Sequence, residues 1–296
     1  MKIHVVESMD LSDEQKARLN GLGEVKYFDG LPGVDEFLER AEGADILAVD
    51  WSPIDAAIPR MKHGVRLISL PFTGVGWVPL KEAASKGIKI ANSPGYSTES
   101  VGEFGIGLML ALVRKIGLYS KSEPATDTAP CLYGKTIGIL GAGRIGGYVG
   151  KVAETLGMKI LFWRRGDDIS NVLKKSDVVY CALPFSDETK GLLGEKEFSQ
   201  MRHGSYFVTT SHNLIYDHHA LLKALDKNLT GAAVDLEGIK VGDYKSEAYL
   251  RFKGHPKVLL TPHVAYKTDY ALKRGRDMMI DNIEAFIKGE PINIVN

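Results

Sequence analysis

TIGILGAGRIGGYVGKVAETLG, residues 136–157, is the stretch that decides the fold. Its first part is an apolar run that predicts a strand at residues 136–140, and a pattern that predicts a helix at residues 144–156 follows. Between them stand Gly141, Gly143 and Gly146, spaced as G-x-G-x-x-G. This motif between a strand and a helix predicts a dinucleotide-binding βαβ unit.

Each of the three glycines has a separate physical reason. Gly141 allows the tight turn, Gly143 lets the backbone approach a pyrophosphate, and Gly146 lets the helix pack closely on the strand. The helix N-terminus adds backbone N–H donors and the positive end of the helix dipole. The motif therefore indicates where the phosphates of a dinucleotide would bind.

The end of the next predicted strand, KILFW at residues 159–163, bears on the choice of coenzyme. Trp163 is followed by Arg164 and Arg165, where an NAD enzyme usually carries an acid for the ribose 2′-hydroxyl. Guanidinium groups cannot accept from a hydroxyl but can clamp a 2′-phosphate. We expect NADP, with NAD possible, and Trp163, Arg164 and Arg165 as cofactor contacts. Two readings stay open: two solvated arginines, or Asp167 and Asp168 turned back to the ribose.

Strands and helices alternate along the whole chain, which predicts parallel sheets with helices on both faces. A polar stretch at residues 120–130 interrupts the pattern, which then restarts, so the sequence predicts two α/β domains. The expected strands are residues 3–6, 25–27, 46–49, 67–70, 88–91, 136–140, 159–163, 178–181, 206–209, 232–235 and 258–260. The expected helices are residues 12–22, 34–41, 100–119, 144–156, 169–174, 217–225 and 268–288.

The composition excludes several other classes of protein. The 296 residues carry 37 Lys and Arg against 37 Asp and Glu, so the basic surface of a nucleic-acid binder is not expected. Two cysteines, far apart in the chain, argue against a zinc site and suit a reducing compartment. No apolar run approaches the length of a membrane span, and the N-terminus does not read as a signal peptide. We expect a cytoplasmic protein without a metal site.

Four ordered motifs carry a family resemblance. They are GVGWVPLKEAASKGIKIANSPGYSTESVGE, GKTIGILGAGRIGGYVGKVAETLGMKI, CALPFSDETKGLL and LLTPHVA. Together they resemble the D-isomer-specific 2-hydroxyacid dehydrogenases, which include glyoxylate and hydroxypyruvate reductases and D-glycerate and D-lactate dehydrogenases. The match runs from about residue 66 to residue 266.

The resemblance implies an architecture. A flavodoxin-like substrate domain would comprise residues 1–93 and 267–296, and a Rossmann-type cofactor domain would comprise residues 94–266. The active site would lie in the cleft between them. Members of the family are usually homodimers, and the helix at residues 100–119 looks like the dimer-forming segment.

The resemblance also implies roles for single residues. The pyrophosphate would be held by Gly141, Gly143, Arg144, Ile145 and Gly146. The rest of the cofactor would contact Leu183, Pro184, Thr189 and Thr210, with Asp235 bonding the nicotinamide carboxamide. The substrate carboxylate would be held by Thr73, Gly74, Val75 and Gly76. His263, in TPH, matches the catalytic acid/base.

Physical chemistry supports His263 independently. Reduction of a 2-oxo acid adds a hydride to carbon and a proton to oxygen, and imidazole is the side chain that ordinarily titrates near neutrality. His263 also follows the predicted strand at residues 258–260, at the carboxyl end where open α/β sheets bind ligands.

Two positions depart from the family pattern. His212 stands where the family carries its substrate-binding arginine, and Lys240 stands where it carries the glutamate that pairs with the catalytic histidine; the nearest acid is Glu237. An imidazole is charged only below about pH 6.5 and cannot fork two bonds to a carboxylate. We expect His212 to take the arginine's place in part, so that carboxylate substrates turn over better near pH 5–6 than at pH 8. The alternative is that His212 is a spectator.

Two functions from different classes are therefore open. The first is an NADP-dependent reductase of a small 2-oxo acid, supported by the TPH histidine. The second is a nucleotide-binding regulatory protein without turnover on the same scaffold, supported by the lost arginine and glutamate. A substrate without a carboxylate would also fit the altered pocket.

Overall fold

The computed structural model covers the full chain and describes residues 1–121, 128–236 and 244–296. The chain divides into two compact units. The first comprises Met1–Ser97 and Thr268–Asn296, and the second comprises Thr98–Lys267. Each contains one sheet, and every strand pair in both sheets is parallel. The predicted fold class of two parallel α/β domains is confirmed.

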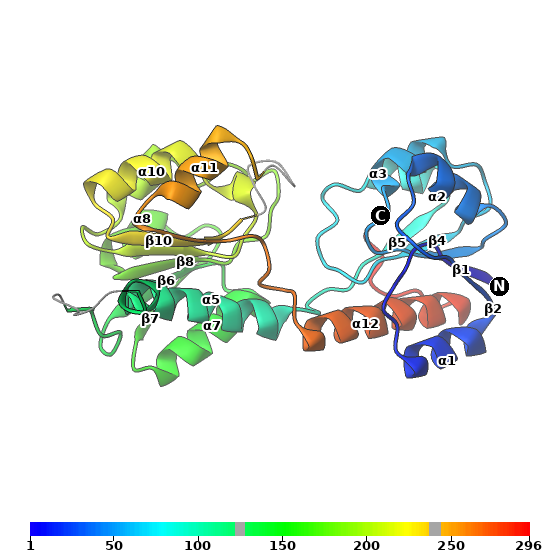
Figure 1. Ribbon diagram of the computed structural model, residues 1–296, viewed down its shortest axis with the longest axis horizontal. Helices are drawn as coiled ribbons and strands as arrows, with labels where there is room; N and C mark the ends of the chain where they lie inside the picture. Colours follow the sequence, from blue (N-terminus) through cyan, green and yellow to red (C-terminus); the bar gives the residue numbers. More distant parts are fainter. Residues whose placement is uncertain (122–127, 237–243) are drawn as a thin grey trace. The chain divides into compact units, whose positions relative to one another are not determined.

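The first unit has a five-stranded sheet in the order β2-β1-β3-β4-β5. Its strands are β1 (Lys2–Val5), β2 (Glu24–Tyr27), β3 (Ile46–Ala48), β4 (Leu67–Ser69) and β5 (Lys89–Ala91). One face is covered by α1 (Asp13–Leu22) and α12 (Asp269–Ile287). The other is covered by α2 (Val34–Ala41), α3 (Ile54–Ala57), the 3-10 helix Ile58–Arg60 and α4 (Leu80–Ser85) (Figure 1).

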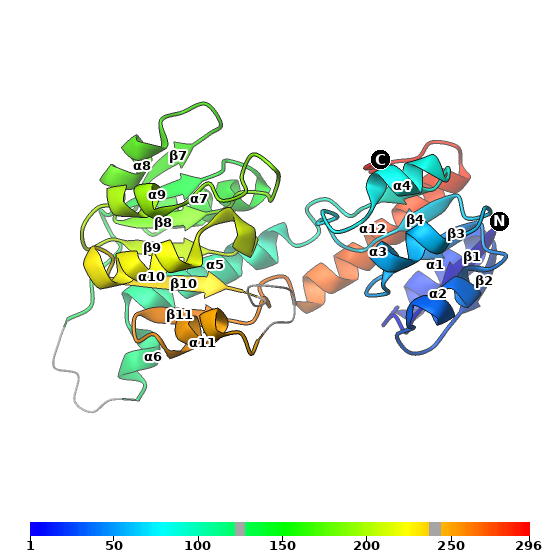
Figure 2. The same ribbon diagram turned by 90° about the horizontal axis from the view of Figure 1, so that it is seen from above.

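The second unit has a six-stranded sheet in the order β11-β10-β9-β8-β6-β7. Its strands are β6 (Thr136–Leu140), β7 (Lys159–Trp163), β8 (Val178–Cys181), β9 (Tyr206–Thr209), β10 (Gly231–Asp235) and β11 (Val258–Thr261). One face is covered by α5 (Thr98–Val113) and α7 (Arg144–Thr155). The other, seen from above in Figure 2, is covered by α8 (Ile169–Lys175), α9 (Glu195–Gln200), α10 (His218–Lys227) and α11 (Glu247–Gly254).

Both faces of this sheet are apolar, which explains its continuous apolar strands. In β8, Val178 and Tyr180 enter the core beneath α5 and α7, whereas Val179 and Cys181 enter the core beneath α8 to α11. Strands buried on both faces are typical of parallel sheets. Because all strands of this sheet are parallel, their carboxyl ends lie at the same edge, together with the loops that follow them.

The prediction of one continuous helix at residues 100–119 is wrong. The structure has α5 ending at Val113 and a separate short helix α6 (Ile116–Tyr119). Lys115 between them has a left-handed φ of 52°, which a continuing α-helix does not allow. The short helices α3, α4, α9 and α11 were not expected, because their runs are too brief to show a helical period.

Within the described residues, no helix is long and apolar enough to cross a membrane.

Candidate functional site

The glycine loop joins β6 to α7. Gly141 has a φ of 103°, and a Cβ there would lie 2.9 Å from the carbonyl oxygen of Ala182. A Cβ on Gly146 would lie 1.9 Å from the carbonyl oxygen of Gly141, so a larger residue would push the helix off the strand. A Cβ on Gly143 would meet nothing within 4 Å. The space beside Gly143 is therefore open, as the approach of a ligand's phosphates requires.

The first turn of α7 suits an anion. Gly143 is its N-cap and offers no side chain to the first backbone N–H groups, and the turn contains no acidic residue. Arg144 is exposed and Ile145 is half-buried against the core beneath α5 and α7. Open N–H groups and the helix dipole favour a phosphate here. The residues present thus fit the pyrophosphate of a dinucleotide.

The turn after β7 is closed by its own hydrogen bonds. The Trp163 Nε1–H donates to the carbonyl of Asp167 at 3.0 Å, and the backbone N–H of Arg164 donates to the Asp167 carboxylate at 2.9 Å. The Asp167 N–H returns a bond to the carbonyl of Arg164 at 3.0 Å. The side chains of Arg164 and Arg165 stay exposed at the end of the strand.

Asp168 is also committed locally. Its carboxylate accepts from the backbone N–H of Ser170 at 2.9 Å and from the Ser170 hydroxyl at 2.6 Å, so it caps α8. These hydrogen bonds lower the pKa of the Asp168 carboxyl. The carboxylate of Asp167 likewise accepts a hydrogen bond within its own turn.

The loop after β8 is held from within. Thr189 is buried, and its hydroxyl donates to the carbonyl of Pro184 at 2.7 Å and accepts from the N–H of Ser186 at 2.8 Å. Leu183 lies in the hydrophobic core, and Pro184 is exposed. Thr189 and Leu183 are therefore the buried side chains that support this loop, and its exposed surface begins at Pro184.

The loop after β9 carries Thr210 and His212. The Thr210 hydroxyl lies 2.8 Å from the hydroxyl of Tyr180. The His212 ring stacks on Phe185 with centroids 4.5 Å apart, and its Nδ1 accepts from the N–H of Leu214 at 3.2 Å. His212 thereby caps the 3-10 helix Asn213–Ile215. Phe185, which the sequence did not single out, is the ring on which this imidazole stacks.

Asp235 organises the loop that carries His263. Its buried carboxylate accepts from the Thr261 hydroxyl at 2.6 Å and from the backbone N–H groups of Val264 at 3.0 Å and Ala265 at 2.9 Å. His263 lies inside this clamp with a left-handed φ of 54° and an exposed side chain. Non-glycine residues seldom adopt this conformation, and here the hydrogen bonds that Asp235 accepts from the next two residues hold the loop in it.

The predicted substrate turn lies in the first unit, after β4. The Thr73 hydroxyl donates to the carbonyl of Ser93 at 2.8 Å and accepts from the N–H of Gly95 at 3.2 Å. The carbonyl of Thr73 accepts from the side-chain amide of Asn92 at 2.8 Å. Thr73 thus anchors the turn. The backbone of its remaining predicted residues, Gly74, Val75 and Gly76, follows directly, with both glycines exposed.

A buried acid lies in the same unit and was missed by the sequence analysis. The Glu7 carboxylate accepts from the N–H groups of Asp50, Trp51 and Ser52 and from the Ser52 hydroxyl, at 2.8–3.1 Å. Burial, with the charge of Glu7 as a second cause, raises the pKa of Asp50 to about 6. Both acids follow neighbouring strands, β1 and β3, which is the signal that could have found them.

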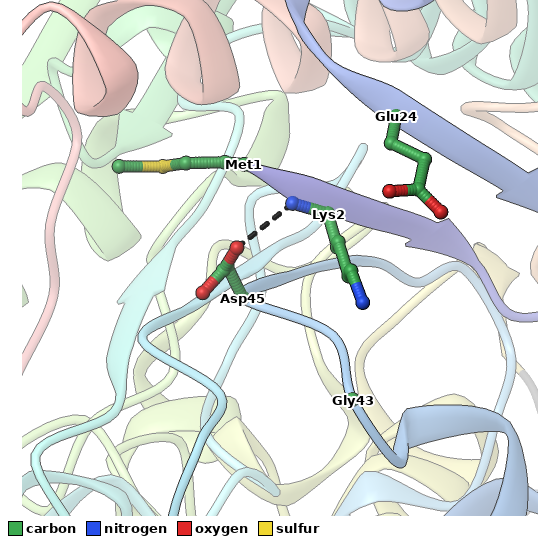
Figure 3. A pocket seen from close by; sticks show the side chains of 5 residues that line it. All are labelled: Met1, Lys2, Glu24, Gly43 and Asp45. Atoms are coloured by element: carbon green, nitrogen blue, oxygen red, sulfur yellow. Dashed lines mark hydrogen bonds between the residues drawn. The ribbon is translucent and has the colours of Figure 1, made fainter.

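A cavity of about 520 Å³ lies at the opposite edge of the first sheet. Figure 3 shows its lining, where the Lys2 N–H donates to Asp45 at 2.8 Å; the other lining residues are Met1, Glu24 and Gly43. This hollow is wide open and borders the amino ends of β1 and β2. It contains none of the predicted site residues, and ligands of open α/β sheets bind at the carboxyl ends.

Two expectations fall outside the described residues, namely those for Glu237 and Lys240. Among the residues that are described, no group of three or more His, Cys, Asp or Glu could hold a metal ion.

The chain is similar to dehydrogenases along most of its length. Residues 106–265 match the family model described as "D-isomer specific 2-hydroxyacid dehydrogenase, NAD binding domain". Glycerate dehydrogenase of Methylorubrum extorquens is 32% identical over 293 residues, covering 92% of each chain. Hydroxypyruvate reductase of Blautia hydrogenotrophica is 29% identical over 324 residues, covering 100% of each chain.

Among solved structures, the acyclic imino acid reductase Bsp5, in complex with NADPH and D-Arg, has a TM-score of 0.89. It is 25% identical, and the similarity covers 100% of each chain. These relatives are named as enzymes, which gives no support to a regulatory protein without turnover. The resemblance inferred from the four sequence motifs is confirmed: this chain belongs to the D-isomer specific 2-hydroxyacid dehydrogenase family and contains that family's NAD-binding domain.

Proposed function

We propose that this protein is an NADPH-dependent reductase of a small 2-oxo acid in which His263 donates the proton. NADH would serve as a weaker coenzyme. The proposal rests on the clamp at residues 261–265, where Asp235 binds two backbone N–H groups and holds His263 in a left-handed conformation. Residues in sparsely populated backbone conformations cluster at functional sites, and His263 also follows β11 at the carboxyl end of the sheet, where open α/β sheets bind ligands.

The preference for NADPH is supported by the turn after β7. Arg164 and Arg165 are exposed there, while Asp167 and Asp168 are occupied with backbone hydrogen bonds. A 2′-phosphate would meet guanidinium groups, which bind phosphate through charge-assisted forks. A 2′-hydroxyl would share the carboxylates of this turn with the backbone N–H groups from which they already accept.

The chemistry divides between coenzyme and protein. A bound nicotinamide coenzyme would supply the hydride. The open backbone at Gly143 and the first turn of α7 would hold its pyrophosphate. His263 would give its proton to the carbonyl oxygen as the oxygen gains charge, which makes it the general acid of reduction and the general base of the reverse reaction.

The substrate carboxylate would bind the backbone of Gly74, Val75 and Gly76, because Thr73 anchors this turn on both sides. His212 would contribute weakly. Its Nδ1 already accepts from Leu214, so a proton added at that nitrogen would end the hydrogen bond. If that nitrogen takes the proton, the better turnover expected at pH 5–6 would require His212 to lose the hydrogen bond that caps the 3-10 helix Asn213–Ile215.

A second candidate reaction is the reduction of a 2-imino acid. One observation favours it: the structural neighbour with a TM-score of 0.89 is named as an acyclic imino acid reductase and was solved with NADPH and D-Arg. An imine differs from a ketone in the atom that receives the proton. His263 could serve either reaction.

One assay separates these reactions. NADPH oxidation is measured with glyoxylate, hydroxypyruvate, pyruvate and bulkier 2-oxo acids, each with and without ammonia or methylamine, between pH 5 and pH 8. Turnover without amine supports the 2-oxo acid reductase, whereas turnover only with amine supports the imino acid. Binding of NADPH without turnover under any condition would refute both.

We also expect a homodimer. Ile116 and Leu118 on α6 are more than half exposed, which suits an interface with a second copy. Light scattering at micromolar concentration should give twice the 32.4 kDa of one chain. A species of 32.4 kDa would refute the dimer.

A further inference from the structure

One ion pair joins the two loops that flank the glycine motif. An Arg165 Nη lies 2.5 Å from a carboxylate oxygen of Glu188. Arg165 belongs to the turn after β7, and Glu188 belongs to the loop after β8. In the sheet these strands are the two neighbours of β6 (Figure 1). The ion pair therefore links the loops on either side of the strand that leads into the glycine loop.

Both loops are held by internal hydrogen bonds. The turn after β7 is closed by reciprocal bonds between Arg164 and Asp167, and Gly166 allows the bend with a φ of 95°. The loop after β8 is held by the Thr189 hydroxyl. The charged ends themselves lie in water, with 78% of the Arg165 side chain and 64% of the Glu188 side chain exposed. An exposed ion pair of this kind is weak and opens easily.

We infer that Glu188 limits the preference for NADPH by competing with its 2′-phosphate for Arg165. The inference rests on the proposed preference for NADPH. A phosphate carries more charge than a carboxylate and offers three acceptor oxygens, so it would displace Glu188 from the guanidinium. The displaced carboxylate then lies close to the phosphate and repels it. With NADH, which has no 2′-phosphate, the ion pair between Arg165 and Glu188 stays intact.

Glu188 thus weakens NADPH binding and leaves NADH binding nearly untouched. Removing the charge of Glu188 should therefore increase the ratio of the NADH Kd to the NADPH Kd. In Glu188→Gln, the Kd of NADPH should fall about 3-fold to 10-fold, and that of NADH should change less than 2-fold. The difference in NADPH Kd between wild-type protein and Glu188→Gln should shrink as NaCl rises from 25 to 300 mM, because exposed charges are screened.

The test uses the full-length protein and two pairs of ligands, NADPH with NADH and 2′,5′-ADP with 5′-AMP, titrated by calorimetry. The variants are Glu188→Gln, Arg165→Gln and the double variant. Glu195→Gln is the matched control, since it also breaks an exposed ion pair in the second unit, with Lys223. Glu195→Gln should change no Kd. The effect of Glu188→Gln should be smaller when Arg165 is already glutamine.

The outcomes separate the inference from the proposed function. Wild-type protein that binds 2′,5′-ADP no more tightly than 5′-AMP refutes the preference for NADPH. If wild-type protein does prefer 2′,5′-ADP but Glu188→Gln leaves the ratio of the two Kd values unchanged or lowers it, the inference about Glu188 alone is overturned. Suppose that Glu188→Gln lowers the Kd of NADPH by the same factor whether residue 165 is arginine or glutamine. Glu188 then does not act by competing for Arg165, and the inference is overturned.

Discussion

The imidazole of His212 lies stacked on the ring of Phe185, with planes 25° apart, while its Nδ1 accepts the N–H of Leu214. This hydrogen bond places the proton of the neutral ring on Nε2. The residue that replaces the family's arginine is thus built into the loop after β9 as a cap. Its contribution to binding a carboxylate and its contribution to the loop can be separated by substitution.

His212→Arg should lower the KM of a 2-oxo acid at pH 8 by about 10-fold, because a guanidinium stays charged and forks two bonds to a carboxylate. His212→Asn is the matched control: asparagine can keep the cap but brings no charge. It should leave KM at pH 8 within 2-fold of wild type. The Kd of NADPH should be unchanged in both. Equal KM values for the two variants would contradict a carboxylate at this position.

Gly143→Ala should separate nucleotide binding from folding. A Cβ there meets no protein atom within 4 Å, so the free energy of unfolding should change by less than about 1 kcal/mol. The same methyl group would block the close approach of a pyrophosphate, and the Kd of NADPH should rise at least 30-fold. Calorimetric titration and urea unfolding measure the two quantities.

Gly146→Ala provides the contrast. Its Cβ would lie 1.9 Å from a backbone oxygen, so this variant should unfold at markedly lower urea concentration. Gly21→Ala in α1, where nothing lies within 4 Å, should change neither property by much. Tight NADPH binding by Gly143→Ala would show that the phosphates do not bind at this loop.

Much of the second sheet could be predicted from the sequence. Strands β6, β7, β8 and β9 have the expected bounds, because each reads as a short apolar run, and β6, β8 and β9 are buried almost throughout. The break in the helix at Lys115 could not be predicted. The apolar pattern continues across it through Leu118, and the sequence shows no proline to mark the end of α5.

The candidate site was predictable only in part, because many of its contacts join residues that are far apart in the sequence. Residues in a motif, such as Gly141 and His263, stand out in the sequence. Partners such as Glu188 and Phe185 do not stand out, because only tertiary structure brings each of them next to its site residue. Glu188 is 23 residues from Arg165, and Phe185 is 27 residues from His212, with no periodic pattern linking either pair.

His218 should make the protein less stable in acid. Its ring lies between Tyr216 and Phe252, and its Nε2 is buried without a hydrogen-bond partner among the described residues. Burial lowers the pKa of His218 from 6.5 to about 4. Between those values the unfolded chain binds a proton that the folded chain does not, so stability falls as the pH falls from 6.5 toward 4. The loss amounts to about 3 kcal/mol at most.

His218→Phe keeps an aromatic ring in this place and removes the titration. Urea unfolding at pH 7.5 and at pH 4.5 should show a smaller loss of stability for the variant than for wild-type protein. His203→Gln, at an exposed position, is the control and should behave as wild type. The idea fails if His218→Phe and wild-type protein lose the same free energy between the two pH values.

Asp235→Asn should reduce turnover by misplacing His263. An amide group has only one acceptor oxygen, so its NH2 would oppose one of the donors that the carboxylate now receives from Val264, Ala265 and Thr261. A shift of the loop by about 1 Å can cost about 100-fold in rate, and we expect kcat to fall 10-fold to 100-fold. A positioning role leaves the Kd of NADPH within about 3-fold, whereas loss of a contact to the nicotinamide carboxamide raises that Kd further. Thr261→Val removes the hydroxyl but keeps both backbone bonds, so its kcat should stay within 3-fold of wild type. An Asp235→Asn protein that retains more than half of its kcat would mean that this clamp does not position the acid.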